Sequence, residues 1–185
     1  MKLPIDHKLE IPRCILRYPY RRDSARLLSA FVSEEFPKYV PLGQIENIEQ
    51  VIDWIESSHK RWNRGQGYTW TAERISDCLV VGQVSLVRLG KGKTWSLAFW
   101  IHPDCWGQGY ATEIASCVIE CAFRDLSATK VCAAAAIWNK GSLRVLEKLG
   151  MKYLGENKEG YRIDDEPIPT KEFALELFDL DGLKI

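Results

Sequence analysis

The stretch HPDCWGQGYATE, residues 102–113, places two glycines between a run typical of a strand and a run typical of a helix. Residues 94–101 are apolar and β-prone, whereas apolar residues after Gly109 recur at helical spacing. Glycine adopts left-handed backbone conformations at low cost, and a helix N-terminus offers N–H groups without intrahelical partners. The turn therefore fits either of two roles: a cradle for an anion, or a strand-to-helix turn that merely needs glycine.

Composition limits the classes of protein that this chain can belong to. Its 185 residues carry 25 Lys+Arg against 25 Asp+Glu, so no basic excess points to nucleic acid as a partner. No apolar run approaches the roughly 18 residues of a membrane span, which argues against a membrane partner. The N-terminus, MKLPIDHKLEIPRC, lacks the apolar core of a signal peptide. We therefore expect a cytoplasmic globular protein with one domain over residues 1–185.

Six cysteines are spread along the chain without CxxC spacing, at positions 14, 78, 105, 117, 121 and 132. Cys117 and Cys121 would share one face of a helix, but no histidine or second cysteine pair nearby in the sequence completes a zinc set. We expect the cysteines to be small buried hydrophobes in a reducing cytosol, and we predict no metal. A redox or metal role is the alternative.

The pattern of apolar residues predicts alternating strands and helices around the glycine turn. The expected strands are 13–20, 68–75, 78–89, 94–101, 130–138, 151–163 and 171–180. The expected helices are 24–36 with Asp23 as N-cap, 46–63, 110–125, and 140–149 with Asn139 as N-cap and Gly150 at C′. This order predicts a mixed α/β fold with a mostly antiparallel, twisted sheet of about seven strands and helices on both faces. The strand at 130–138 should run parallel to its neighbour.

Two common phosphate-binding motifs are absent from the glycine turn. It lacks the GKS or GKT of a P-loop. A third glycine of a dinucleotide fold would fall at position 112, which is Thr112.

Two motifs at a fixed separation carry a resemblance to a known family. They are FWIHPDCWGQGYATE at 99–113 and, starting 27 residues after Thr112, NKGSLRVLEKLGM at 139–151. Together they resemble the GCN5-related N-acetyltransferase (GNAT) family, and within it the branch of ribosomal-protein-alanine N-acetyltransferases. Trp106 stands where the family motif has Gln or Arg. The resemblance implies a GNAT-type sheet over about 13–178, with acetyl-CoA as co-substrate.

The resemblance also implies which residues bind coenzyme A. Main-chain N–H groups of Gln108 to Thr112 would hold the pyrophosphate, while the backbone of the preceding strand would bind the pantetheine arm. That arm would enter a V-shaped opening between the strands at 94–101 and 130–138. The implied coenzyme contacts are Trp100, Ile101, Gly107, Gln108, Gly109, Tyr110, Ala111, Thr112, Asn139 and Ser142.

Catalytic residues are less clearly marked in the sequence than the coenzyme loop. The resemblance implies Ser142 as the general acid that protonates the departing thiolate; the alternative is a residue that only starts a helix. Some relatives use a tyrosine one turn later, but that position is Leu146. Candidates for a general base are Glu73 and His102, followed by Glu159 and Tyr161. For His102, beside Pro103, a hydrogen bond within the turn is the alternative.

The lack of an obvious base bears on the acceptor. An α-amine with a pKa near ~8 is neutral in roughly one molecule in ten at pH 7, whereas lysine near ~10.4 is neutral in about one in 2500. This difference favours an α-amine that loses its proton through a water relay. Aromatic residues could line the acceptor site or belong to the core: Trp54, Trp62, Trp70, Trp100 and Tyr161. The acidic IDDE at 163–166 could attract an amine or be a solvated loop.

The leading hypothesis is an acetyl-CoA-dependent N-acetyltransferase that transfers acetyl to a primary amine by direct attack in a ternary complex. A protein or peptide N-terminus is the favoured acceptor. One alternative is an acetyltransferase for a small-molecule amine, such as a polyamine, an amino acid or an antibiotic. The other is a non-catalytic acyl-CoA-binding module. We expect a monomer or homodimer.

Overall fold

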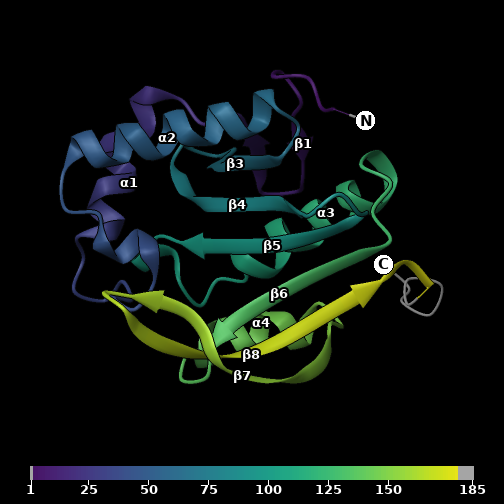
Figure 1. Cartoon of the computed structure of the whole chain (residues 1–185). Coiled ribbons are helices and arrows are strands. Elements are labelled where there is room, and N and C mark those ends of the chain that lie inside the picture. Colours follow the sequence, from purple (N-terminus) through teal and green to yellow (C-terminus); the bar gives the residue numbers. More distant parts are fainter. Residues whose placement is uncertain (1, 179–185) are drawn as a thin grey trace.

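The computed structural model describes residues 2–178 and contains one mixed sheet with the strand order β1-β2-β3-β4-β5-β6-β8-β7 (Figure 1). Every neighbouring pair is antiparallel except β5 and β6, which are parallel as predicted. The strands are β1 (Leu9–Glu10), β2 (Cys14–Arg17), β3 (Gly67–Arg74), β4 (Val80–Leu89), β5 (Thr94–Ile101), β6 (Lys130–Ala136), β7 (Lys152–Ile163) and β8 (Glu166–Glu176).

Four α-helices cover the two faces of this sheet, with α1 and α2 on one face and α3 and α4 on the other (Figure 1). Adjacent residues of β4 show the division, because Val80 packs with the α1–α2 cluster and Val81 with the α3 cluster. Within residues 2–178 no helix is long and apolar enough to span a membrane. The helices are α1 (Ser24–Phe31), α2 (Ile48–Asn63), α3 (Tyr110–Asp125) and α4 (Lys140–Lys148), with short 3-10 turns at Arg21–Asp23, Pro41–Gln44 and Pro103–Cys105.

The predicted fold class is confirmed, with one strand more than the expected seven. The additional strand, β1, pairs only Leu9 and Glu10 with β2. β4 begins at Val80 instead of 78, because Cys78 has a φ of 58° and cannot continue a strand.

The last strand differs most from the prediction. β8 begins at Glu166, not at 171, and the final two residues of the predicted strand, 179–180, lie outside the described part of the chain. Its early part contains Pro167 and Pro169, which argue against a strand in the sequence. Strand structure is tolerated there because β8 pairs with β6 only from Thr170 onward, so that proline's missing N–H costs no bond on that side.

α1 is shorter than the predicted helix and ends at Phe31 instead of 36. In a helix, Phe36 would lie ~140° around the axis from Phe31. The chain instead turns after Val32, which lets both rings pack together at 5.4 Å and against Trp100. The freed segment between α1 and α2 then forms one side of the cavity described below. Asp23 precedes α1 but makes no side-chain cap, because its carboxylate binds Arg17.

Candidate active site

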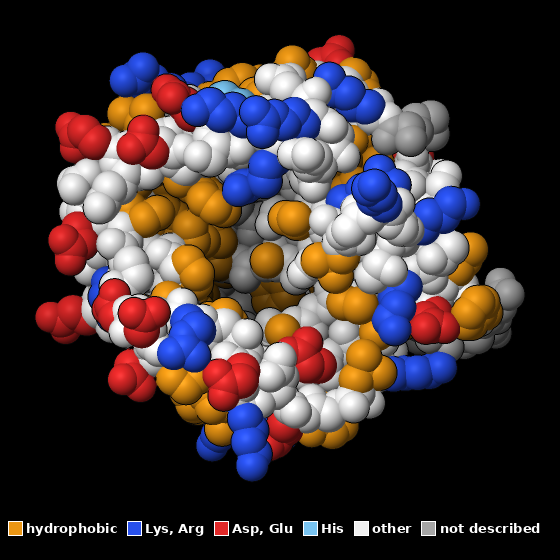
Figure 2. All heavy atoms as spheres, in the orientation of Figure 1, with side chains coloured by type: hydrophobic (Ala, Val, Ile, Leu, Met, Phe, Trp, Pro, Cys, Tyr) orange, Lys and Arg blue, Asp and Glu red, His pale blue; other side chains and the backbone are white. Residues whose placement is uncertain are grey.

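A cavity of about 1120 Å³ opens where β5 and β6 separate. Figure 2 shows a hollow near the centre of this face, with hydrophobic side chains on its walls. Its lining comes from the α1–α2 segment, β4, β5, the start of α3, β6 and α4. Nine of the ten predicted coenzyme contacts line it: Trp100, Ile101, Gly107, Gly109, Tyr110, Ala111, Thr112, Asn139 and Ser142.

The separation of β5 and β6 is visible in the strand register. β5 pairs with β4 over its whole length, from Thr94 to Ile101, but with β6 only through Thr94, Trp95 and Ser96. Beyond Ser96 the two strands diverge, and both line the cavity, β5 with 97–101 and β6 with 133–136. The β6 segment consists of four alanines, whose small side chains leave room between the strands. An extended chain with amide groups could therefore bind along the free edge of β5.

The glycine loop enters α3 with its first N–H groups uncapped. Gly107 has a φ of 73° and Gly109 a φ of 83°, a region in which side chains other than glycine are strained. Gly109 is the N-cap of α3 and supplies no side-chain hydrogen bond. A Cβ built on Gly107 would meet no atom within 4 Å, so the loop faces open space. We call Gly107 and Gly109–Thr112 the glycine-loop wall; its exposed N–H groups and helix dipole suit a pyrophosphate.

Arg13, which the sequence analysis did not single out, holds this loop from outside the cavity. Its Nη1 donates to the carbonyl oxygen of Gln108 at 3.0 Å, and its guanidinium lies 4.1 Å from the ring centre of Tyr110. Its Nε also donates to Glu113 Oε2 at 2.7 Å, which neutralises a carboxylate in the first turn of α3. Gln108 is the one predicted coenzyme contact whose side chain does not line the cavity, since it donates to the carbonyl of Asp104 instead.

Asn139 and Ser142 mark the start of α4 beside the cavity. The Asn139 side chain accepts a hydrogen bond from the Ser142 amide at 3.1 Å, so it caps the helix as expected. Ser142 lines the cavity, and its hydroxyl makes no hydrogen bond to another group within residues 2–178. Leu146, at the position of the tyrosine used by some relatives, is buried and also lines the cavity.

Glu73, the first candidate base, lies outside the cavity lining. Its Oε2 accepts hydrogen bonds from Arg17 Nε at 2.8 Å and Nη2 at 2.6 Å. Arg17 is buried and is held on its other side by Asp23. This ion-pair network joins β2, β3 and the start of α1, and it occupies the carboxylate that a base would need free.

His102 also lies outside the cavity lining. It makes contacts within the turn, which were the expected alternative to a role as general base. Its Nδ1 lies 2.8 Å from Asp104 Oδ1, and its Nε2 lies 3.1 Å from Ser29 Oγ on α1. Burial lowers the pKa of His102, and the cation Arg26 lowers it further against the opposing effect of Asp104. The histidine therefore connects the end of β5 to α1.

Tyr161 is the only one of the four candidate bases that lines the cavity, among the described residues. Its burial, aided by Tyr39, raises the pKa of its hydroxyl to about 12. At neutral pH this hydroxyl stays protonated and can donate a hydrogen bond but cannot accept a proton. The carboxylates in the lining are Glu34 and Glu35, both exposed at the rim, and the lining includes no histidine. Glu159 and the acidic 163–166 turn lie outside it.

Side chains from three separate elements form a second wall, which we call the α2 wall: Trp54 of α2, Thr69 of β3 and Gln83 of β4. Trp54 Nε1 donates to Gln83 Oε1 at 3.1 Å, and Gln83 Nε2 donates to Thr71 Oγ1 at 3.1 Å. These bonds fix the orientation of the buried carboxamide.

The five candidate acceptor aromatics fall into two groups. Trp54, Trp100 and Tyr161 line the cavity, whereas Trp62 and Trp70 are fully buried in the core. Trp100 also has an indole N–H that is buried without a partner within the described residues.

The family is identified by comparison with known proteins. The model of the acetyltransferase (GNAT) domain family matches residues 13–152. The chain is 26% identical over 168 residues to the uncharacterized N-acetyltransferase YoaA of Bacillus subtilis (strain 168), covering 90% of this chain and 95% of that protein.

Solved structures share this fold. A putative ribosomal-protein-serine acetyltransferase from Vibrio cholerae has a TM-score of 0.82 at 17% identity, over 94% of this chain and 99% of that one. The microcin C7 self-immunity acetyltransferase MccE, solved with acetyl-CoA and AMP, has a TM-score of 0.81 at 16% identity, over 90% and 94%.

The family match defines an acyltransferase. The chain belongs to the GNAT family, and it is an acetyl-CoA-dependent N-acetyltransferase. Its own geometry fits the co-substrate: α3 begins without a side-chain cap, the glycine-loop wall faces open space, and β5 has a free edge beyond Ser96.

Proposed function

We propose that this enzyme acetylates the α-amine of a protein or peptide N-terminus, as in the ribosomal-protein acetyltransferase branch. The observation that carries the proposal is the lack of a base in the cavity lining: Glu34 and Glu35 lie at the rim, and Tyr161 keeps its proton. An amine with a pKa near ~8 needs little help to become neutral, whereas a lysine or polyamine nitrogen near ~10.4 needs a strong base.

The coenzyme would bind along the glycine-loop wall and the free edge of β5. The N–H groups at the start of α3 would face the pyrophosphate, and the edge of β5 at Trp100 and Ile101 would bind the amides of the pantetheine arm. Asn139 would contact the same arm while its oxygen continues to cap α4.

Acetyl transfer would proceed by direct attack of the amine on the thioester carbonyl. The amine would lose its proton through water, which reaches the exposed rim near Glu34 and Glu35. Ser142, whose hydroxyl is unpaired within the described chain, would protonate the departing thiolate and would regain a proton from the water that takes up the proton of the amine. The α2 wall, with its fixed Gln83 carboxamide, would position the acceptor. Glu73 and His102 would keep the structural roles described above.

A small-molecule acceptor is the second candidate, because one structural neighbour is a microcin self-immunity acetyltransferase solved with AMP. The test is acetyl-CoA turnover by the full chain with three sets of acceptors. These are short peptides with free N-termini, the same peptides with blocked N-termini and a free lysine, and small amines including polyamines and amino acids. Turnover confined to free N-termini supports the proposal. Preference for small amines or lysine side chains overturns it, and binding of acetyl-CoA without any turnover identifies a non-catalytic module.

We propose a cytoplasmic location and a single domain for this enzyme. Every cysteine within the described chain is free, which fits a reducing cytoplasm. All eight strands, β1 to β8, belong to one sheet, which supports a single domain.

A further inference from the structure

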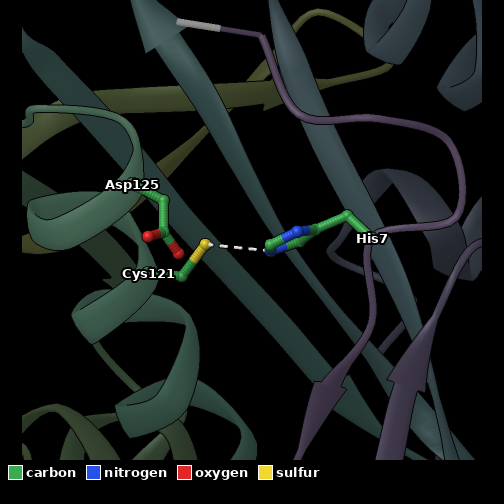
Figure 3. Close-up of side chains that lie close together, drawn as sticks. All are labelled: His7, Cys121 and Asp125. Carbon is green, nitrogen blue, oxygen red and sulfur yellow. Dashed lines mark hydrogen bonds between the residues drawn. The ribbon is translucent and has the colours of Figure 1, made fainter.

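Three potential metal ligands meet behind α3, away from the cavity. His7 comes from the N-terminal segment, while Cys121 and Asp125 lie one turn apart on α3 (Figure 3). Their ligand atoms all lie within 4.8 Å of one another, and Cys121 Sγ is 3.8 Å from His7 Nε2. A sequence separation of 114 residues hides this cluster from any search for local spacing.

The environment of the cluster favours a structural role for its cysteine. Cys121 is fully buried, as structural cysteines usually are. All described cysteines are free, including Cys117 one turn earlier on α3. A buried thiol that faces an imidazole and a carboxylate has the donor set of a zinc site instead.

We propose that His7, Cys121 and Asp125 bind a divalent metal ion of the zinc class, with water as a fourth ligand. Zinc bonds of about 2.0–2.3 Å require ligand atoms closer together than 4.8 Å, so the cluster contracts on binding. The thiol releases its proton to solvent and its sulfur forms the metal bond. Asp125 and His7 are half-exposed, which gives the ion a route from solvent.

One neighbouring charge competes with the ion. Arg124 donates to both Asp125 oxygens, at 2.9 Å and 2.8 Å, and its side chain is 65% exposed. A carboxylate oxygen accepts more than one bond, and the exposed arginine can turn into solvent. The ion therefore does not require a change in the backbone of α3.

The proposed site would attach the N-terminal segment to the far end of α3. Arg13 already joins the same part of the chain to the start of α3 through Glu113 and Gln108. A metal at His7 would add a second attachment near the C-terminus of the helix whose N-terminus faces the coenzyme. Binding should therefore stabilise the fold without taking part in acetyl transfer.

The test is metal binding by the tag-free, chelator-treated full chain. Calorimetry should show one Zn²⁺ per chain, and Co²⁺ should give a thiolate-to-metal charge-transfer band. Cys121→Ser should abolish the band and weaken Zn²⁺ binding by at least about 10-fold, since even loss of an outer-shell partner costs about 10- to 100-fold. His7→Gln and Asp125→Asn should weaken binding similarly. Cys117→Ser, on the same helix, is the matched control and should bind as the wild type does.

No binding by the wild-type chain, or binding that Cys121→Ser leaves unchanged, overturns the proposal. If Cys121→Ser does not fold, His7→Gln decides, because His7 is half-exposed on a terminal segment. Wild-type affinity in His7→Gln then overturns the site. The midpoint of thermal unfolding with and without Zn²⁺ gives a readout independent of activity, and it should rise only in chains with all three ligands.

Discussion

The glycine-loop wall of the cavity, Gly107 and Gly109–Thr112, comes from one short part of the chain, the turn into α3 and its first residues. The α2 wall is made of side chains from α2, β3 and β4, joined by the bonds between Trp54, Gln83 and Thr71. The first wall depends on backbone conformation, which a short motif specifies. The second depends on packing between elements, and under the proposed function it is the wall that would contact the acceptor.

Gly107→Val tests the glycine-loop wall and should have the largest effect. Valine is strained at a φ of 73°, and its side chain would project from the loop into the space available to the pyrophosphate. We expect kcat/KM for acetyl-CoA to fall about 100-fold, as for other displacements of bound reactants. Gly90→Val is the matched control, because Gly90 has a φ of 61° and also no atom within 4 Å of an added Cβ. Equal losses in both variants would assign the effect to backbone strain.

Ser142→Ala tests the proposed general acid, which lies at the start of α4 and belongs to neither wall. A thiolate with a pKa near ~8.5 is a fair leaving group, so loss of its proton donor should lower kcat only about 10-fold. The KM for acetyl-CoA should stay near the wild-type value, because Asn139 still caps α4. Steady-state kinetics with both substrates varied measures the two constants separately. An unchanged kcat would leave Ser142 as a residue that only begins the helix.

Two tryptophan variants compare the two walls: Trp54 belongs to the α2 wall, and Trp106 directly precedes the glycine-loop wall. Trp54→Phe removes the N–H that holds Gln83, and Trp106→Phe removes the N–H that donates to the Ile101 carbonyl at 2.7 Å. Loss of one such bond costs about 1 kcal/mol, or about 5-fold in a binding constant. We expect Trp54→Phe to raise the KM for the acceptor and Trp106→Phe to raise the KM for acetyl-CoA. If either variant changes both constants equally, the two walls are not independent.

Tyr161→Phe should have the smallest effect. Burial raises the folded-state pKa of Tyr161 to about 12, so its hydroxyl remains protonated throughout the assay range. Its titration therefore cannot cause the fall in rate at low pH in the pH–rate profile. The rate should rise with pH to a plateau above about pH 8, following the α-amine. The profiles of wild type and Tyr161→Phe should therefore coincide in shape. If the fall in rate at low pH is present in the wild type and absent in Tyr161→Phe, Tyr161 acts as a base and the proposed function is contradicted.

Arg13 and Glu73 show that sequence reasoning succeeded for local features and was incomplete for contacts between distant parts of the chain. The glycine turn, the Asn139 cap and the parallel β5–β6 pair followed from local spacing and were found in the structure. Arg13 was missed because it reaches Gln108 across 95 residues. Glu73 was considered as a base because the sequence does not show that Arg17, 56 residues away, occupies its carboxylate.

By itself, the sequence determined the family, the glycine turn and the order of the longer strands and helices. These features depend on backbone conformation and on residues a few positions apart, which a sequence displays directly. The tertiary structure alone decided that Trp54 and Trp100 line the cavity while Trp62 and Trp70 fill the core. It also brought His7 to Cys121. Such contacts arise when whole elements pack, and packing joins side chains according to their position in space and not along the chain.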